Sequence, residues 1–459
     1  MPDAELTLLL SRAQFAVTIG LHIILAGFSF GLSLWLVALE GAWLWRRQQR
    51  WLDLYNFWLK IFALNVAVGV VSGVVMEFQF GTNWAPFIER VGGLIGPLMF
   101  YEVLVAFFLE AGMVGVMMFG MERIGPRLHF MVTVLVAVGA LISVFWILAA
   151  NSWMQTPTGF FLDEQQRFQP QNWLAIIFSP SFPWRAAHML LAMLIGTAFM
   201  VAGTGAWQLL HHSDNQRARL MLTISLWLLP FLTVTQAVVG DLHGENTLQH
   251  QPAKMAAMEG DWQRPPPGKG EPLRLFALPD QQQQRNHWEV AIPLIGSLYL
   301  RHNLSGQIKS LHEFPSEDIP PVAPVFFAFR LMVGLGILML TVSLTALVQR
   351  LRGHLWRSRR LLKLLVLMGP AGFIAMLSGW IVTEMGRQPW TVYGLVRTAD
   401  SVSPISSHLA IASGCAILLV YGLVFTIGLR YLLRYARKAP QTDEPGPAQE
   451  MRPDHGGER

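Results

Sequence analysis

The chain has 459 residues, of which 53% are hydrophobic and only 14% are charged, with a formal net charge of +5. Soluble domains average roughly 25% charged residues, so this composition excludes an ordinary soluble protein and predicts a membrane protein. The single cysteine, Cys415, lies in an apolar run, which excludes an internal disulfide framework and a cysteine-based zinc or iron–sulfur site. Any metal must therefore be held by histidine, methionine or carboxylate.

Nine apolar runs are long enough to cross about 30 Å of hydrocarbon as helices. In chain order they cover residues 14–40, 56–77, 94–120, 129–150, 185–210, 219–240, 325–349, 362–384 and 404–434. The predicted fold class is therefore an all-α integral membrane protein with nine transmembrane helices arranged in bundles. The N-terminus carries Asp3 and Glu5 before its first basic residue, which is the wrong charge for a secretory signal, so we expect the whole chain to be mature protein.

The distribution of basic residues predicts the topology. The connectors after the first, third, fifth and seventh spans are basic, as is the end of the ninth: Arg46, Arg47, Arg50; Arg123, Arg127; Arg217, Arg219; Arg350, Arg352, Arg357, Arg359, Arg360; Arg430, Arg434, Arg437, Lys438. The alternate short connectors are nearly neutral. By the positive-inside rule, the N-terminus is expected outside and the C-terminus in the cytoplasm. The same rule accounts for the net charge, and no nucleic-acid partner is expected.

We expect four regions: residues 1–240 with spans one to six, a long outer connector over 241–324, residues 325–438 with spans seven to nine, and a disordered cytoplasmic tail over 439–459. A connector of this length is either a solvated linker or a functional loop. The helix-forming stretch from Lys254 to Trp262 indicates that its first half is ordered. No internal repeat is visible.

Four residues of metal-ligand type are expected near the outer ends of their spans: His22, His188, Met332 and Glu384. An ionisable side chain inside a membrane requires a compensating partner. A lone histidine can simply bond a neighbouring helix, and a membrane methionine usually only packs. Because all four are expected at one depth, and because such side chains hold iron in haems, they form a candidate haem site.

Two further features concern charge within the spans. Glu102 and Glu110 are eight residues apart in one span, hence about 12 Å apart along the axis and about 80° apart in azimuth. They suit either a proton relay or a pair of neutral, hydrogen-bonded structural carboxyls. At the exit of the eighth span, Trp380, Glu384 and Arg387 bring an indole, a carboxylate and a guanidinium together.

Several other chemistries lack their motifs. The chain has no G-x-x-x-x-G-K loop, no G-x-S-x-G elbow and no H-E-x-x-H pair. A secondary transporter is the main alternative, because it would also bury carboxylates, but it predicts broken helices at the midplane and often an internal repeat. A cofactor-free structural subunit would explain the spans but not four ligand-type residues at one depth.

Several segments together resemble subunit I of the cytochrome bd-type quinol oxidases, in the same order along the chain. They are Arg12–Phe15 through His22, Met76–Trp84, Ala106–Glu110, Trp146–Asn151 with Trp153–Gln155, Phe329–Arg330 with Met332, and Gly386–Trp390. The resemblance covers roughly residues 10–435, and its last motif is highly specific.

The resemblance implies the cofactors and their ligands. His188 and Met332 would be the axial ligands of a low-spin haem b. Glu384 would ligate a high-spin haem b, and His22 the oxygen-reactive haem. The expected complement is two haem b and one haem d, or a third haem b in its place. Trp380 would lie between haems.

The resemblance also implies roles for charged residues. Lys254 and Glu259 match loop residues associated with quinol binding. The matching proton-path carboxylates are Glu102 and Glu110. Arg330 and Arg387 would offset the charge of haem propionates or of the ligand carboxylate.

The implied function is a terminal oxidase of the bacterial inner membrane. It would oxidise quinol at the outer face and reduce oxygen to water at a haem pair with cytoplasmic protons, which generates proton-motive force. Its expected partners are a second subunit (subunit II), quinol, oxygen and membrane lipid, with a small single-span subunit as a further candidate. The connector after Trp262 is short, which resembles the short-loop, often cyanide-insensitive branch of the family.

Overall fold

The computed structural model of this chain describes residues 3–105, 108–109, 112–266 and 268–437. Most of this part is helical. The helices are α1 (Asp3–Arg46), α2 (Gln49–Thr82), α3 (Ala85–Val105), α4 (Gly112–Phe119), α5 (Met121–Ile124), α6 (Pro126–Gln155), α7 (Trp173–Ile177), α8 (Phe182–His211), α9 (Gln216–His250), α10 (Pro252–Glu259), α11 (Ile295–Arg301), α12 (Val322–Leu351), α13 (Arg359–Met368), α14 (Ala371–Met385) and α15 (Ser407–Ala436).

Six short strands form three two-stranded antiparallel sheets. They pair as β1 (Phe160–Leu162) with β2 (Phe168–Pro170), β3 (Leu273–Asp280) with β4 (Arg285–Ile292), and β5 (Trp390–Val392) with β6 (Val396–Arg397). The predicted all-α membrane class is confirmed for the long helices. The sequence did not predict the sheets, which are small and lie in connectors.

Within the described ranges, eight helices are long and apolar enough to cross a membrane, with α13 and α14 counted as one span. The remaining expected span, 94–120, begins within α3 and ends just past α4. Residues 106–107 and 110–111 between these helices lie outside the described part of the chain, and so does the expected disordered tail over 439–459. The count of nine spans and the orientation of the termini therefore stay predictions.

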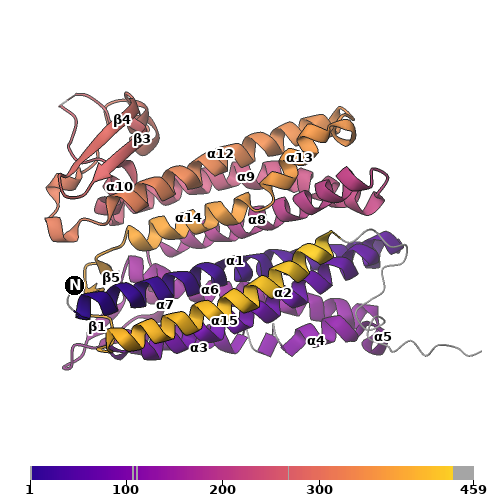
Figure 1. The fold of residues 1–459 in the computed structure, drawn as a ribbon, viewed down its shortest axis with the longest axis horizontal. Helices are drawn as coiled ribbons and strands as arrows, with labels where there is room; N and C mark the ends of the chain where they lie inside the picture. The colour runs from indigo at the N-terminus through magenta and orange to yellow at the C-terminus, as the bar shows by residue number, and fades with distance from the viewer. Residues whose placement is uncertain (1–2, 106–107, 110–111, 267, 438–459) are drawn as a thin grey trace, which may run out of the picture.

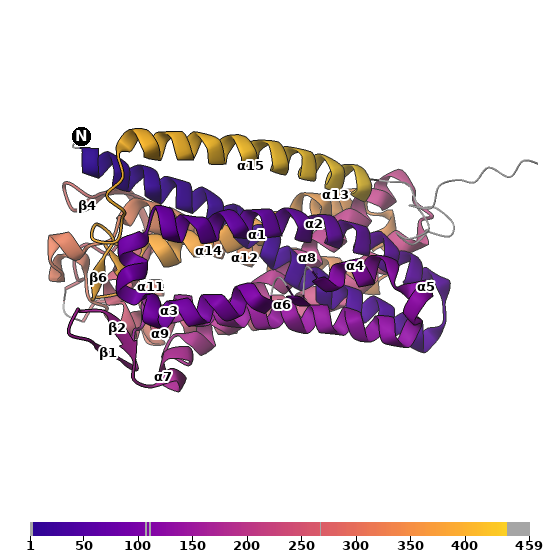
Figure 2. The same cartoon turned by 90° about the horizontal axis from the view of Figure 1, so that it is seen from below.

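The long helices form two bundles that meet where α1 of one packs against α8 and α14 of the other (Figure 1). In one bundle α8 packs on α9, α13 and α14, while α12 packs on α9 and α14. The other contains α1, α2, α3, α4 and α6, and α15 lies along α1 and α2 on its outer face (Figure 2). One continuous apolar core runs through both bundles and includes the fully buried Leu36, Phe199 and Leu365.

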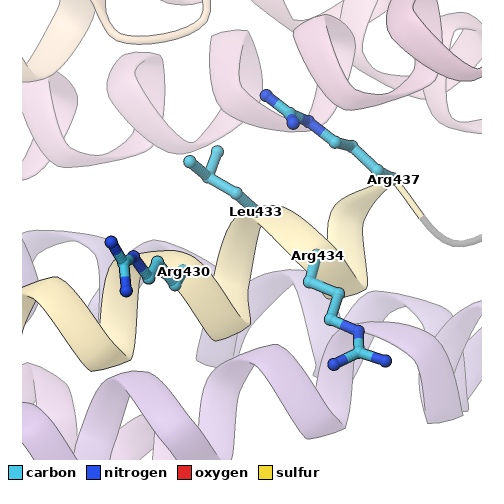
Figure 3. Close-up of a pocket in the computed structure, with 4 residues that line it drawn as sticks. All are labelled: Arg430, Leu433, Arg434 and Arg437. Carbon is cyan, nitrogen blue, oxygen red and sulfur yellow. The ribbon is translucent and has the colours of Figure 1, made fainter.

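The two ends of the molecule differ in character. All six strands and the helices α7, α10 and α11 lie at one end, which we call the hairpin end, whereas α5 and the C-terminal end of α15 lie at the other (Figures 1 and 2). At that second end, Arg430, Leu433, Arg434 and Arg437 of α15 line a surface pocket (Figure 3). The basic connectors and the short sheets are thus segregated to opposite ends, as the positive-inside pattern requires of a membrane protein.

Local sequence sets several helix ends. α6 begins at Pro126, where the missing proline N–H costs nothing, directly after Gly125 with a φ of 78°. α10 ends at Glu259 because Gly260 adopts the left-handed conformation, with a φ of 62°, and its N–H bonds carbonyls of the last helical turn.

The 241–324 connector is shorter and more ordered than a solvated linker. α9 continues to His250 instead of ending near residue 240, so Asp241 lies on this helix. The helix ends there because Pro252 disfavours the helical conformation at Gln251. The expected ordered first half is confirmed by α10, and the second half adds the β3–β4 hairpin and α11. The solvated-linker alternative is therefore wrong for the described residues of this connector.

A buried polar network ties α1 to α6 at the end of the bundle away from the hairpins. His129 Nδ1 lies 2.6 Å from Glu40 Oε1, and both side chains are fully buried. Thr133 donates a 2.6 Å hydrogen bond to the other Glu40 oxygen, and Tyr55 reaches Thr133 at 3.1 Å. His129 Nε2 lies 2.9 Å from the carbonyl oxygen of Met117. The residues of this network lie on α1, α2, α4 and α6, so the network fixes the relative position of these four helices.

Substitution of His129 by alanine should therefore destabilise the protein by about 3–5 kcal/mol, because it leaves the Glu40 carboxyl buried without its main partner. The thermal unfolding midpoint of the detergent-solubilised protein measures this loss. His212→Ala, an exposed histidine at the end of α8, is the matched control and should leave the midpoint unchanged. Equal midpoints for the two variants would contradict a structural role for the network.

Candidate functional site

His22 of α1 lines a cavity of about 470 Å³ between α1, α2, α3, α6, α8 and α14. Its Nδ1 lies 2.9 Å from Ser72 Oγ, which orients the ring. A side chain at Gly73 would place its Cβ only 3.1 Å from the imidazole, so glycine at this position makes room for the ring. Trp380 of α14 lines the same cavity, and most of the lining is apolar. The cavity thus presents one imidazole to a largely apolar space.

Two carboxylates also line this cavity, Glu77 of α2 and Glu102 of α3. Ser143 of α6 donates a 3.1 Å hydrogen bond to Glu102. Glu102 is one of the carboxylates predicted from the sequence, whereas Glu77 was not predicted, although both are carboxylates within apolar runs. Glu110, the other carboxylate of the predicted proton path, lies outside the described residues.

Glu384, in the last turn of α14, sits in a polar cluster near the hairpin end. Arg387, three residues later, makes a short ion pair with one carboxylate oxygen. Asn151 donates a 2.8 Å hydrogen bond to the other oxygen, and Gln155 lies 3.5 Å from it. The Glu384 side chain nevertheless keeps 33% of its surface accessible, so a bound group can still reach the carboxylate.

Three cations surround this one carboxylate. Arg185 of α8 approaches Asn151 at 3.4 Å, and Lys254 of α10 donates to Gln155 at 2.7 Å. With Arg387 they give the cluster more positive than negative charge. Burial lowers the pKa of Lys254 well below its usual range. The positive charges of Arg185 and Arg387 lower this pKa further, whereas the negative charge of Glu384 raises it.

Buried donors in this cluster lack acceptors. Nε of Arg185, and Nε and Nη1 of Arg387, have no hydrogen-bond partner within the described part of the chain. A buried donor left without an acceptor costs about 1–3 kcal/mol, so these N–H groups are expected to meet an anionic or carbonyl oxygen of a bound group. The excess positive charge fits a ligand that carries carboxylates.

His188 and Met332 lie in the bundle of α8, α9, α12 and α14. His188 Nδ1 is buried and makes no hydrogen bond to any described residue. Its ring packs edge-on against that of His243 on α9, with centroids 5.3 Å apart. A Cβ at Gly240 would lie 3.3 Å from His188, and one at Gly379 would lie 3.0 Å from the Met332 sulfur. Glycines on neighbouring helices therefore let both candidate ligands pack closely against α9 and α14.

The connector supplies the remaining candidates. Glu259, at the end of α10, is buried and pairs with Arg330 of α12 at 2.9 Å. Arg330 also bonds the Arg274 carbonyl at 2.6 Å, so it joins α10 and β3 to α12. Asp241 lies apart from this group, 42% exposed, with its carboxylate 3.2 Å from His302.

The structure brings together most of the residues that the sequence singled out. Glu384, Arg387 and Lys254 form one cluster, His22, Glu102 and Trp380 line one cavity, and Glu259 pairs with Arg330. The sequence analysis gave no role to several residues now found at these positions: Glu77, Asn151, Gln155, Arg185 and His243. The segments around Asn151 and Gln155 were noted, but Arg185 and His243 carried no signal beyond being polar residues in long helices.

These features fit haem groups. Imidazole, thioether and carboxylate are iron ligands in haem proteins, a cavity lies beside His22, and the Glu384 side chain stays partly accessible. The unpaired guanidinium N–H groups of Arg185 and Arg387 suit the propionates that haem carries. The residues present are therefore compatible with haem binding near the hairpin end of the bundles.

Comparison with known proteins identifies the family. A family model described as cytochrome bd terminal oxidase subunit I matches residues 10–440. Cytochrome bd-II ubiquinol oxidase subunit 1 of Escherichia coli (strain K12) is 32% identical over 511 residues, which cover 95% of this chain and 98% of that protein. Cytochrome bd ubiquinol oxidase subunit 1 of Bacillus subtilis (strain 168) is 32% identical over 452 residues, which cover 95% of each chain.

A solved structure agrees with this result. The bd oxidase from Geobacillus thermodenitrificans superposes with a TM-score of 0.87 at 26% identity, covering 95% of this chain and all of that one. The apolar helices, the cavity at His22 and the charged cluster at Glu384 therefore belong to a quinol:oxygen oxidoreductase, and this multi-pass membrane chain is a member of the cytochrome bd oxidase subunit I family.

Proposed function

We propose that this chain binds three haems, oxidises quinol at its connector and reduces oxygen to water at a haem pair. The observation that carries this proposal is the cluster at Glu384, where buried guanidinium N–H groups of Arg185 and Arg387 lack acceptors. Donors in such a setting require anionic oxygen, which haem propionates supply. Bound haem would carry electrons from quinol to oxygen and provide the place where oxygen is reduced.

Each haem would be held by residues already described. His188 and Met332 would hold a low-spin haem b between α8 and α12, and Glu384 would hold a high-spin haem b. His22 would hold the oxygen-reactive haem, either haem d or a third haem b, in the cavity that Trp380 also lines. In this arrangement Arg387 keeps Glu384 ionised in a medium of low dielectric constant, and Arg185 donates to propionate oxygen.

Protons for oxygen reduction would reach the cavity through carboxylates in the spans. Glu77 and Glu102 both line it, and Ser143 holds Glu102 in place by a hydrogen bond. Glu110 is the further member predicted from the sequence. If the hairpin end faces outward, protons drawn from the cytoplasm cross most of the membrane, at about 2.3 kcal/mol per charge per 100 mV.

Quinol would be oxidised where the connector packs on α12. Glu259 would accept a proton from a quinol hydroxyl, and Arg330 would hold its carboxylate in place. Lys254 is also buried and would act from the side of the haem cluster, where it bonds Gln155. Asp241 is a weaker candidate, because it is exposed and paired with His302.

The name subunit 1 given to the relatives implies a second subunit, and we infer that this chain works with one in the bacterial inner membrane. We propose residues 241–324 as an outer quinol-binding region between spans one to six and spans seven to nine. The transporter alternative is set aside, because the relatives are oxidoreductases and a ligand-rich cluster at one end of the helices is atypical of transporters.

The ligand assignment predicts that two variants lose different haems. Glu384→Ala should lose the high-spin haem b and disturb the haem at His22, while the low-spin haem held by α8 and α12 survives. Met332→Leu preserves apolar volume but removes a ligand, so it should abolish or shift the low-spin α-band and spare the other haems. Haem extraction and the reduced spectrum of each purified complex measure these losses. A full haem complement in Glu384→Ala would disprove its role as a ligand.

The proton path predicts the effect of Glu102→Gln. The amide keeps the size and the hydrogen bond to Ser143 but does not titrate, so quinol oxidase turnover should fall about 100-fold. Haem content should change little. Oxygen uptake with saturating quinol measures turnover, and Ser143→Ala is the comparison that weakens the hydrogen bond alone. Unchanged turnover in Glu102→Gln would favour the structural-carboxyl alternative.

The quinol site predicts a selective defect in Glu259→Gln. The variant keeps an oxygen for Arg330 but no longer accepts a proton, so quinol-driven oxygen uptake should fall about 100-fold. Oxygen uptake driven by a small chemical reductant that bypasses the quinol site should stay near normal. Equal losses with both donors would instead indicate damage to the haem region.

A further inference from the structure

Three buried carboxylates gather in the connector beside the proposed quinol site: Glu259 at the end of α10, Asp261 just after it, and Glu271 just before β3. None is more than 2% exposed. Two arginines lie among them, Arg274 on β3 and Arg330 on α12. The group is separate from the haem-binding candidates, and only Glu259 has a role in the proposed quinol chemistry.

Each arginine pairs with a buried acid, and Arg274 also contacts an acid that reaches the surface. Arg330 pairs with Glu259 at 2.9 Å. Arg274 lies 3.2 Å from Asp261 through Nη2 and 3.2 Å from Glu289 through Nε. Glu289, on β4, is 34% exposed. One side of Arg274 therefore contacts a fully buried carboxylate and the other a carboxylate in contact with solvent.

The charges of the buried group do not balance. Three carboxylates and two guanidinium groups leave one negative charge in excess when all are ionised. Three carboxylate oxygens of the group have neither a hydrogen-bond donor nor an ion-pair partner in the described chain: Glu259 Oε1, Asp261 Oδ2 and Glu271 Oε2. A buried acceptor without a donor is costly, and one added proton would both supply a donor and cancel the excess charge. The group is therefore suited to hold one exchangeable proton.

The expected acidities agree with this count. The pKa of Asp261 is raised to about 7, mainly by burial. Arg274 opposes this rise, and the negative charges of Glu271 and Glu259 add to it. Burial also raises the pKa of Glu271, and the negative charge of Glu259 raises it further. The hydrogen bond from the Ile308 N–H and the charges of Arg274 and Arg264 lower it. Tyr299 of α11 faces the same group, and burial and the Glu259 charge raise its pKa well above the usual range.

We propose that Asp261 is a proton-relay residue for quinol oxidation, which takes the proton that Glu259 receives from quinol and releases it toward the solvent-exposed side of the connector, where Glu289 lies. The inference rests on the proposed quinol site at Glu259. Asp261 acts through Glu259 and does not contact quinol itself.

The step balances without a further reactant. Quinol gives up two electrons, which pass to oxygen through the oxidoreductase, and two hydroxyl protons. Each O–H bond of quinol breaks as Glu259 gains a proton. Glu259 then loses that proton to Asp261, which returns it to the ionised form for the next transfer. The proton then leaves Asp261 for water, which returns Asp261 to its ionised form.

The primary test is the pH dependence of turnover in Asp261→Asn. Below about pH 7 Asp261 is protonated and cannot accept a further proton, so turnover of the unmodified complex should decline as the pH falls through this value. The variant should turn over quinol about tenfold more slowly above pH 7 and should lack this decline. The backbone of Asp261 is held by 2.8 Å hydrogen bonds to Ala256 and Leu311, so the isosteric side chain should leave the local fold intact.

Glu313→Gln is the matched control. Glu313 lies in the same connector and caps a short turn through Ser310, a contact that glutamine can keep, but it is partly exposed and outside the relay. This variant should keep both the turnover and the pH profile of the unmodified complex. An unchanged pH profile in Asp261→Asn would overturn the relay.

A second readout separates a relay from a structural role. Infrared difference spectra recorded between quinol-reduced and oxidised complex should contain a band from a buried protonated carboxyl that Asp261→Asn lacks and Glu313→Gln retains. A band that persists in Asp261→Asn would contradict the proposal even if turnover fell.

The same experiments distinguish failure of the relay from failure of the quinol site. Quinol turnover by the unmodified complex and the Glu259→Gln variant test the site itself, whereas the difference between the unmodified complex and Asp261→Asn tests the relay. Oxygen uptake with a chemical reductant that bypasses quinol should be equal in all variants. Loss of that activity in Asp261→Asn would assign the residue a role in folding or haem retention and overturn the relay.

Discussion

An ionised carboxylate inside a membrane requires a cation close to it, and the Glu384–Arg387 ion pair at the end of α14 meets this requirement. The rest of the charged cluster depends on that pair. Asn151 and Gln155 from α6 bond the same carboxylate, and through them Arg185 and Lys254 are drawn to it from α8 and α10. One carboxylate thus organises residues from four helices that are far apart in the sequence.

The excess of cations over anions in this cluster makes sense if an anionic group binds there. Two buried arginines with unpaired N–H groups would be unfavourable in an empty apolar bundle. They would become favourable if the propionate oxygens of the proposed haem accepted hydrogen bonds from them. In the connector the imbalance is reversed, because Glu259, Asp261 and Glu271 outnumber the buried arginines beside them. The proposed haem cluster and the proposed quinol site therefore carry opposite imbalances of charge.

The sequence was sufficient for features that depend on local pattern. The apolar runs predicted the long helices, although polar turns continue α9 as far as His250. The spacing of Glu384 and Arg387, three residues apart at a helix end, predicted their ion pair directly. The matching segments around His22, Met332 and Arg387 indicated the family before the fold was considered.

Features that depend on packing between distant segments could not be predicted in this way. Arg185 reads as one basic residue at a helix start, and its place beside Glu384 arises only when α8 packs on α14. The β3–β4 hairpin has an irregular register, so its strands lack a clean alternating pattern. Asp261, Glu271 and Arg274 come from separate turns of the connector, and only the folded chain reveals their imbalance of charge.

The central claim is that the cation-rich cluster and the cavity at His22 hold haem. The most direct measurement is the reduced-minus-oxidised optical spectrum of the complex purified with its partner subunit, combined with haem extraction and quantification. The account predicts three haems for each copy of this chain, one of them with the α-band of a low-spin haem b. A complex that oxidises quinol but contains no haem bound to this chain would contradict it.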